Sequence, residues 1–164
     1  PRSRPVRTSS RATPTSRRPL TALIPDLRGS MSYPTTPWRV MRTLPAEGAW
    51  NMAVDESILE STSNKTTLPT LRLYDWNPFA LSLGHAQPAA DGDLATLDDK
   101  HWSLVRRLTG GRAILHADEL TYSVCAPIDD PIVKGSILES YHRISRALIR
   151  GLEIIGVKTE STPK

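Results

Sequence analysis

Apolar and polar positions alternate along this chain in a way that predicts an α/β (α+β) fold. From residue 38 onward, short strand-like runs are separated by turn residues, and two longer segments show helical spacing. We expect strands near residues 38–44, 70–76, 79–84, 103–108, 112–116 and 119–126, with main helices near 48–61 and 136–155. These elements predict a mixed sheet with both helices packed on one side of it.

The predicted helix 136–155 has the clearest apolar stripe. Its apolar residues recur three or four positions apart, which places them on one helical face. They are Ile137, Tyr141, Ile144, Leu148, Leu152 and Ile155. Gly156 then follows as a candidate C′ cap. We expect a scaffold helix that packs on the sheet.

The predicted helix 48–61 carries both an apolar stripe and a pair of carboxylates. Trp50, Val54 and Ile58 lie four residues apart and predict the buried face. Asp55 and Glu56 stand in the middle of the helix, where paired carboxylates could serve acid–base chemistry. Because adjacent helical residues point in different directions, a solvated face is the favoured interpretation of this pair.

The predicted strand 70–76 has an unusual face. Side chains alternate across a strand, so Arg72, Tyr74 and Trp76 share one side of it. This combination is not typical of a core. Two interpretations remain open, an amphipathic outer surface or the wall of a ligand site.

A pair of glycines interrupts the run from Arg106 to Ser123. Gly110 and Gly111 stand between two strand-like segments, where the backbone needs positive φ or must let another group come close. A β-hairpin with a Gly-Gly turn is one interpretation. The other is a turn that binds an anionic or carbonyl-bearing ligand, because arginine forks and an imidazole surround it. These residues are Arg106, Arg107, Arg112 and His116.

Composition and charge exclude several classes of protein. The 164 residues suit one domain, and no apolar run is long enough to span a membrane. A single cysteine excludes an internal disulfide framework and fits a reducing compartment. The net charge is +4, but residues 1–30 hold seven Arg and one Asp, a net of +6, which leaves −2 for residues 31–164. The charge count therefore indicates no basic patch for nucleic acid on the domain.

Residues 1–37 form a basic leader rich in Arg, Ser, Thr and Pro. Such a segment cannot bury enough apolar surface to offset the entropy of ordering it, so we expect disorder there and a folded domain over 38–164. The composition also fits an organellar transit peptide, or translated sequence upstream of a start at Met31. Without a transit peptide, we expect a cytoplasmic protein.

The run RRLTGGRAILHADELTYSV, residues 106–124, resembles the signature of the biotin/lipoate protein ligase superfamily. Its ELTYSV ending and Arg112 are most similar to the octanoyltransferase branch. The segments NMAVDE, residues 51–56, and LRLYDWNPFALSLGHAQ, residues 71–87, are also similar to family patterns. The resemblance implies a biotin/lipoate ligase-like catalytic domain, truncated at its C-terminus.

The same resemblance implies a set of substrate-binding residues. They come from the strand 70–76, the segment around Gly84, and the glycine signature. The set comprises Arg72, Tyr74, Gly84, Gln87, Arg106, Arg107, Gly110, Gly111, Arg112, His116, Thr121 and Ser123.

The implied reaction moves an octanoyl group from acyl carrier protein to a lysine of a lipoyl domain. The acceptors would be the glycine cleavage H protein or the E2 component of a 2-oxoacid dehydrogenase. Octanoyl transfer needs no cofactor, whereas the alternative, ATP-dependent lipoate–protein ligation, needs ATP and magnesium. Arg112 stands where ligases usually have a third glycine, which favours transfer. We expect neither nucleic acid nor a membrane as a partner, and neither a metal site nor zinc-ligand spacing.

The family's nucleophilic cysteine and its helper lysine are expected beyond Lys164. Cys125 shares a predicted strand face with Thr121 and Ser123, but neither Lys nor His adjoins it in the sequence. We expect a buried small side chain and assign no catalytic residue within the chain. An inactive fragment or paralogue that only binds an acylated partner is therefore a further alternative.

Overall fold

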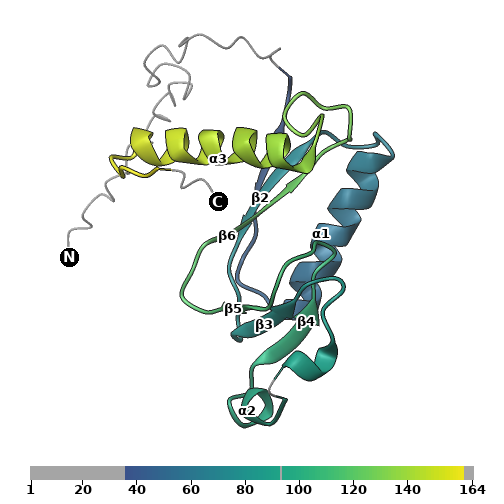
Figure 1. Ribbon diagram of the computed structural model, residues 1–164, viewed down its shortest axis with the longest axis vertical. Coiled ribbons are helices and arrows are strands. Elements are labelled where there is room, and N and C mark those ends of the chain that lie inside the picture. The colour runs from purple at the N-terminus through teal and green to yellow at the C-terminus, as the bar shows by residue number, and fades with distance from the viewer. Residues whose placement is uncertain (1–35, 93, 161–164) are drawn as a thin grey trace, which may run out of the picture. The chain divides into compact units, whose positions relative to one another are not determined.

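The structure is a computed structural model that describes residues 36–92 and 94–160. The predicted leader therefore lies outside the described residues as far as position 35. The described part contains six strands, three α-helices and one short 3-10 helix, arranged as Figure 1 shows. The strands are β1 (Arg39–Arg42), β2 (Thr70–Tyr74), β3 (Ala80–Leu83), β4 (Ser103–Arg106), β5 (Ile114–His116) and β6 (Thr121–Cys125). The helices are α1 (Gly48–Ser63), η2 (Ala89–Asp91), α2 (Leu94–Asp99) and α3 (Ile137–Ile154).

The α/β class with mixed strand pairing is confirmed, but the strands form two sheets and not one. In the first sheet, of order β1-β2-β6, β2 runs parallel to β1 and antiparallel to β6. In the second sheet, of order β4-β3-β5, β3 runs parallel to β4 and antiparallel to β5. The chain changes sheet at Asn77-Pro78, because β2 and β3 on either side of this turn pair with different neighbours.

Helix α1 packs through a face that the apolar pattern predicted only in part, since Ile58 is buried as expected. Its buried residues are Gly48, Asn51, Ile58 and Thr62, whereas Trp50 is 61% exposed. Gly48 permits a close approach to β4, since a Cβ atom there would lie 2.7 Å from Val105 Cγ1. The predicted stripe was wrong at Trp50 because polar side chains of α1 find partners on the first sheet.

Helix α3 is well formed but buries none of its residues. Ser136 begins it with a capping box, in which the serine hydroxyl and the Glu139 carboxylate each accept a backbone N–H of the other residue. Gly156 follows the helix with φ 89°, so the predicted C′ cap is confirmed. The expectation that this helix packs on the sheet is wrong for the described residues, and Ile137 is 77% exposed.

Aromatic side chains form the core where the two sheets meet. Tyr74, the last residue of β2, and Trp76, two positions after it, are buried together with Ala80 of β3. Met52 of α1 and Val105 of β4 pack against this cluster. The outer-surface interpretation of Tyr74 and Trp76 is therefore wrong, and the cluster holds the first sheet against the second.

Candidate functional site

The glycine pair lies on a loop that crosses the end of β3. Strands β4 and β5 do not pair with each other, because each pairs with β3, one on either side. The hairpin interpretation of Gly110 and Gly111 is therefore wrong. The segment 107–113, which we call the glycine loop, must instead pass from one side of β3 to the other.

Gly84 makes this crossing possible. It follows the last residue of β3, and a Cβ atom at this position would lie only 2.0 Å from the carbonyl oxygen of Gly111. Gly111 has φ 94°, a left-handed conformation that favours glycine. Gly110 differs from both, because a Cβ atom there would meet no heavy atom within 4 Å. The fold therefore requires Gly84 and Gly111, while Gly110 leaves open space above the loop.

Two adjacent arginines hold two different loops by their carbonyl oxygens. Arg106 Nη1 donates to the carbonyl oxygens of Gly84, at 2.8 Å, and of Gln87. Arg107 Nη2 instead donates to the carbonyl oxygens of Gly110 and Arg112, at 3.2 and 2.8 Å. The two side chains point in opposite directions, as strand alternation requires. Arg106 holds the segment after β3, and Arg107 holds the glycine loop.

Arg107 also anchors the glycine loop to the strand beneath it. Its Nη1 donates to the carbonyl oxygen of Ser82 at 2.7 Å and to Ser82 Oγ at 2.6 Å. Burial lowers the pKa of the Arg107 guanidinium from its ordinary value. The Arg112 side chain, by contrast, is exposed on the loop and makes no hydrogen bond within the described residues. This side chain is therefore available to an anionic ligand.

His116 is the centre of a set of contacts that we call the His116 network. Its Nε2 lies 2.6 Å from Ser82 Oγ, and its Nδ1 contacts the carboxylate of Glu119. The Trp76 ring stacks on the imidazole, with ring centroids 4.1 Å apart. The network comprises Trp76, Ser82, Arg107, His116, Glu119 and Thr121. The His116 side chain is 5% exposed, so it does not face solvent. It is connected to the glycine loop through Ser82 and Arg107.

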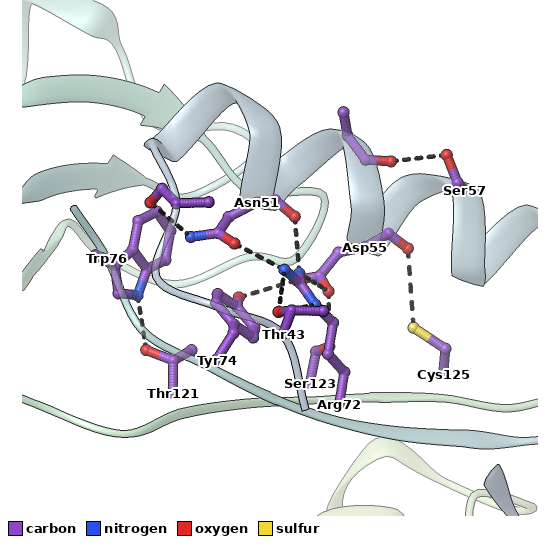
Figure 2. A network of polar contacts seen from close by, with 12 residues as sticks. Thr43, Asn51, Asp55, Ser57, Arg72, Tyr74, Trp76, Thr121, Ser123 and Cys125 are labelled. Atoms are coloured by element: carbon purple, nitrogen blue, oxygen red, sulfur yellow. Dashed lines mark hydrogen bonds and ion pairs between the residues drawn. The ribbon is translucent and has the colours of Figure 1, made fainter. Parts of the chain in front are cut away.

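Arg72 and Tyr74 belong to a second set of contacts, the Asp55 cluster, between α1 and the first sheet (Figure 2). Arg72 Nη1 donates to Asp55 Oδ1 at 2.8 Å, and the Tyr74 hydroxyl donates to Oδ2 at 2.9 Å. Ser123 Oγ donates to Oδ1 at 2.8 Å. The cluster comprises Thr43, Asn51, Asp55, Arg72, Tyr74 and Ser123.

The Asp55 cluster joins helix α1 to strands β2 and β6 of the first sheet. Arg72 is fully buried, and it also donates to Asn51 Oδ1 at 2.7 Å and to Thr43 Oγ1 at 3.0 Å. Burial, and then the charge of Asp55, raise the pKa of Tyr74. The solvated-face interpretation is therefore wrong for Asp55, whose side chain is 16% exposed, while Glu56 is exposed as expected. The polar groups of Arg72 and Tyr74 thus hydrogen-bond to other residues of the fold, chiefly Asp55.

Cys125 lies in the interior, as its strand position predicted. It is 7% exposed, and its Sγ lies 3.9 Å from the carbonyl oxygen of Asp55. Burial, and next the charge of Asp55, raise the pKa of this thiol to about 11. A nucleophilic cysteine needs a depressed pKa and access to substrate, and Cys125 has neither.

The expected site residues thus separate into two groups. The glycine loop unites Gly84, Gln87, Arg106, Arg107, Gly110, Gly111, Arg112 and His116; Thr121 joins them through Glu119. Arg72, Tyr74 and Ser123 belong to the Asp55 cluster. Sequence reasoning missed Ser82, Asp55 and Glu119 as partners. The spacing of Glu119, three residues after His116, was the only local signal for any of them.

A hollow in the described residues lies away from the glycine loop. It has a volume of about 290 Å³ between β1 and the outer side of α1, with Met41, Trp50 and Val54 in its wall. None of its lining residues belongs to the glycine signature. Within the described ranges, no group of His, Cys, Asp and Glu could hold a metal ion, and no helix has the length and apolarity to cross a membrane.

The chain belongs to the lipoyl protein ligase A/B catalytic domain family, which matches residues 47–164. It is 44% identical over 128 residues to the octanoyltransferase LipM of Moorella thermoacetica. That alignment covers 77% of this chain and 47% of the relative, so the chain spans about half the length of the curated relatives it matches.

Solved structures agree on the fold. Protein Ta0514 of T. acidophilum, assigned as a lipoate protein ligase and solved with bound lipoic acid, superposes with a TM-score of 0.68 at 25% identity. The match covers 79% of this chain and 52% of that one. A lipoate-protein ligase A bound with ATP superposes with a TM-score of 0.69 at 24% identity, over 79% and 51% of the two chains.

Proposed function

We propose that this protein transfers an octanoyl group from acyl carrier protein to a lysine of a lipoyl domain. The observation that carries the proposal is the glycine loop, whose outer backbone is open at Gly110 and flanked by the exposed Arg112. Such a loop offers N–H donors and a fixed cation to an acyl carbonyl or to the phosphate of a phosphopantetheine arm. The similarity to octanoyltransferase LipM supports transfer over other acyl chemistry.

In this proposal the described residues bind and position the acyl group. Arg107 holds the loop by Gly110 and Arg112, so the loop is formed before any ligand arrives. Cys125 is excluded as the acyl acceptor, because its thiol is buried and its pKa is raised to about 11. The nucleophile and its lysine partner would come from outside the residues that align with the curated relatives.

The proposal includes the partners and the location. The donor is octanoyl-acyl carrier protein, and the acceptors are lipoyl domains of the H-protein and E2 type. No cofactor takes part in the transfer, whereas the ligase alternative would use ATP and magnesium. A cytoplasmic location is part of the proposal, since a single cysteine fits a reducing compartment.

The test is nucleotide-free acyl transfer by the full-length protein. Octanoyl-acyl carrier protein and a lipoyl domain are incubated with it, and the masses of enzyme and acceptor are measured. We expect an octanoyl adduct on the enzyme and then on the acceptor. Acylation seen only with free lipoate, ATP and magnesium would instead assign the protein to ligation. No acylation under either condition would favour the binding-only alternative.

A pair of glycine variants tests the role of the loop. Gly110→Ala introduces a methyl group into open space, so the protein should fold normally. We expect it to lose transfer activity, because the methyl group occupies the surface that the acyl group approaches. Gly151→Ala on α3 also meets no heavy atom within 4 Å and is the matched control, with unchanged activity expected. Equal activity of the two variants would contradict the role of the loop.

A further inference from the structure

The donors and acceptors of the His116 network determine where its protons lie. An arginine can only donate, so Ser82 Oγ accepts from Arg107 Nη1 at 2.6 Å. The serine proton is then directed at His116 Nε2, 2.6 Å away, because the carbonyl oxygen of Ile114 is 3.5 Å from the same hydroxyl. Nε2 is therefore an acceptor, and the ring proton resides on Nδ1, which donates to Glu119.

The carboxylate of Glu119 is itself held in place. Thr121 Oγ1 donates to Glu119 Oε1 at 2.8 Å, and Trp76 Nε1 donates to Thr121 Oγ1 at 2.7 Å. Trp76 also stacks on His116 at an interplanar angle of 13°, which restricts the tilt of the imidazole. The Trp76 indole thus orients the Glu119 carboxylate through Thr121, and it orients the His116 ring by stacking on it.

The order Ser82–His116–Glu119 matches that of a nucleophilic triad, but the surroundings exclude this role. Ser82 is fully buried in β3, and its oxygen is occupied by Arg107. A nucleophile must present its oxygen to substrate, and this oxygen faces the guanidinium. These hydrogen bonds instead connect the Glu119 carboxylate to Arg107 by way of His116 and Ser82. Arg107 in turn holds the glycine loop by two carbonyl oxygens.

We propose that Glu119 is a positioning residue for the glycine loop, acting through His116, Ser82 and Arg107. It holds His116 in the Nδ1–H tautomer, because a carboxylate is the preferred partner of an imidazole N–H. Ser82 Oγ is then free to accept from Arg107, and the guanidinium is held where it fixes Gly110 and Arg112. The inference rests on the proposed function only in taking the loop as the place where the acyl group binds.

The test is the tautomer of His116, observed by ¹⁵N NMR of the full-length protein labelled with ¹⁵N at histidine and glycine. The His116 signals are assigned by their loss in His116→Gln. We expect a protonated Nδ1 and an unprotonated Nε2 at neutral pH. Glu119→Ala should lose this pattern and shift the backbone amide signals of Gly110 and Gly111, whereas Glu119→Gln, which retains an acceptor oxygen, should keep both.

The exposed neighbour Asp118 supplies the control, since Asp118→Ala should change neither signal. A wild-type His116 protonated on Nε2 would overturn the proposal. So would glycine amide signals that stay in place in a folded Glu119→Ala protein. Should that variant not fold, Glu119→Asp withdraws the carboxylate from Nδ1 and is judged by the same criteria. Neither readout requires turnover, so a failure of octanoyl transfer would count against the proposed function alone.

Discussion

The Asp55 cluster and the His116 network both join segments that are far apart in the sequence, but they end differently. In the Asp55 cluster, the donors of Arg72, Tyr74 and Ser123 all converge on one carboxylate between α1 and the first sheet. The His116 network ends instead at Arg107, which holds a loop with an open outer surface. The first set of contacts therefore fixes a helix to a sheet. The second fixes a loop and leaves part of its backbone available.

This comparison shows why a family signature contains residues of two kinds. Some residues, such as Arg72, are needed because the fold buries them and must satisfy them. Others, such as Gly110, have open space where a side chain would lie, and this space is available to a ligand. Substitutions in the two regions should therefore affect stability and activity in different proportions.

The largest effect is expected at the Asp55 carboxylate. Asp55→Ala leaves the guanidinium of Arg72 buried without its charge partner, which should lower the free energy of unfolding by about 3–5 kcal/mol. Urea denaturation of the full-length protein measures this loss. Glu56→Ala, at the exposed neighbouring position, should stay within about 0.5 kcal/mol of wild type. Similar losses in both variants would show that the cluster does not hold α1.

A smaller effect on stability is expected at the crossing of the glycine loop. Gly84→Ala places a methyl group 2.0 Å from the Gly111 carbonyl oxygen, so the backbone must move. We expect a loss of about 1–3 kcal/mol, together with the loss of acyl transfer. Gly110→Ala should lose transfer without this loss of stability. If Gly84→Ala were as stable as Gly110→Ala, the loop would not cross β3 as closely as described.

The smallest effect concerns the pH dependence that Cys125 contributes. Burial raises the pKa of its thiol to about 11, so the native state holds the proton more tightly than the unfolded chain. The contribution to stability is complete below the ordinary thiol pKa of about 8.5 and is lost as the pH rises from there through about 11. In Cys125→Ala, the free energy of unfolding should therefore fall less steeply over this range. Parallel pH profiles for the two proteins would contradict the raised pKa.

The sequence by itself determined the positions of the main strands and helices and the need for glycine at position 111. Both follow from local causes. Alternation and helical spacing mark strands and helices, and the lack of a side chain at Gly111 permits its φ of 94°. The boundaries of β6 and α3 agree with their predicted ranges for the same reason.

Only the tertiary structure decided which faces are buried and which polar groups are partners. Burying a charged group such as Arg72 is favourable only where partners surround it, and its partner Asp55 stands 17 positions away on a different element. Periodicity along one helix carries no information about such a partner, so Trp50 was expected inside and Asp55 outside. The glycine loop was ambiguous for a similar reason. Whether Gly110 and Gly111 close a hairpin or cross β3 depends on which strands pair, and that is settled between segments distant in the sequence.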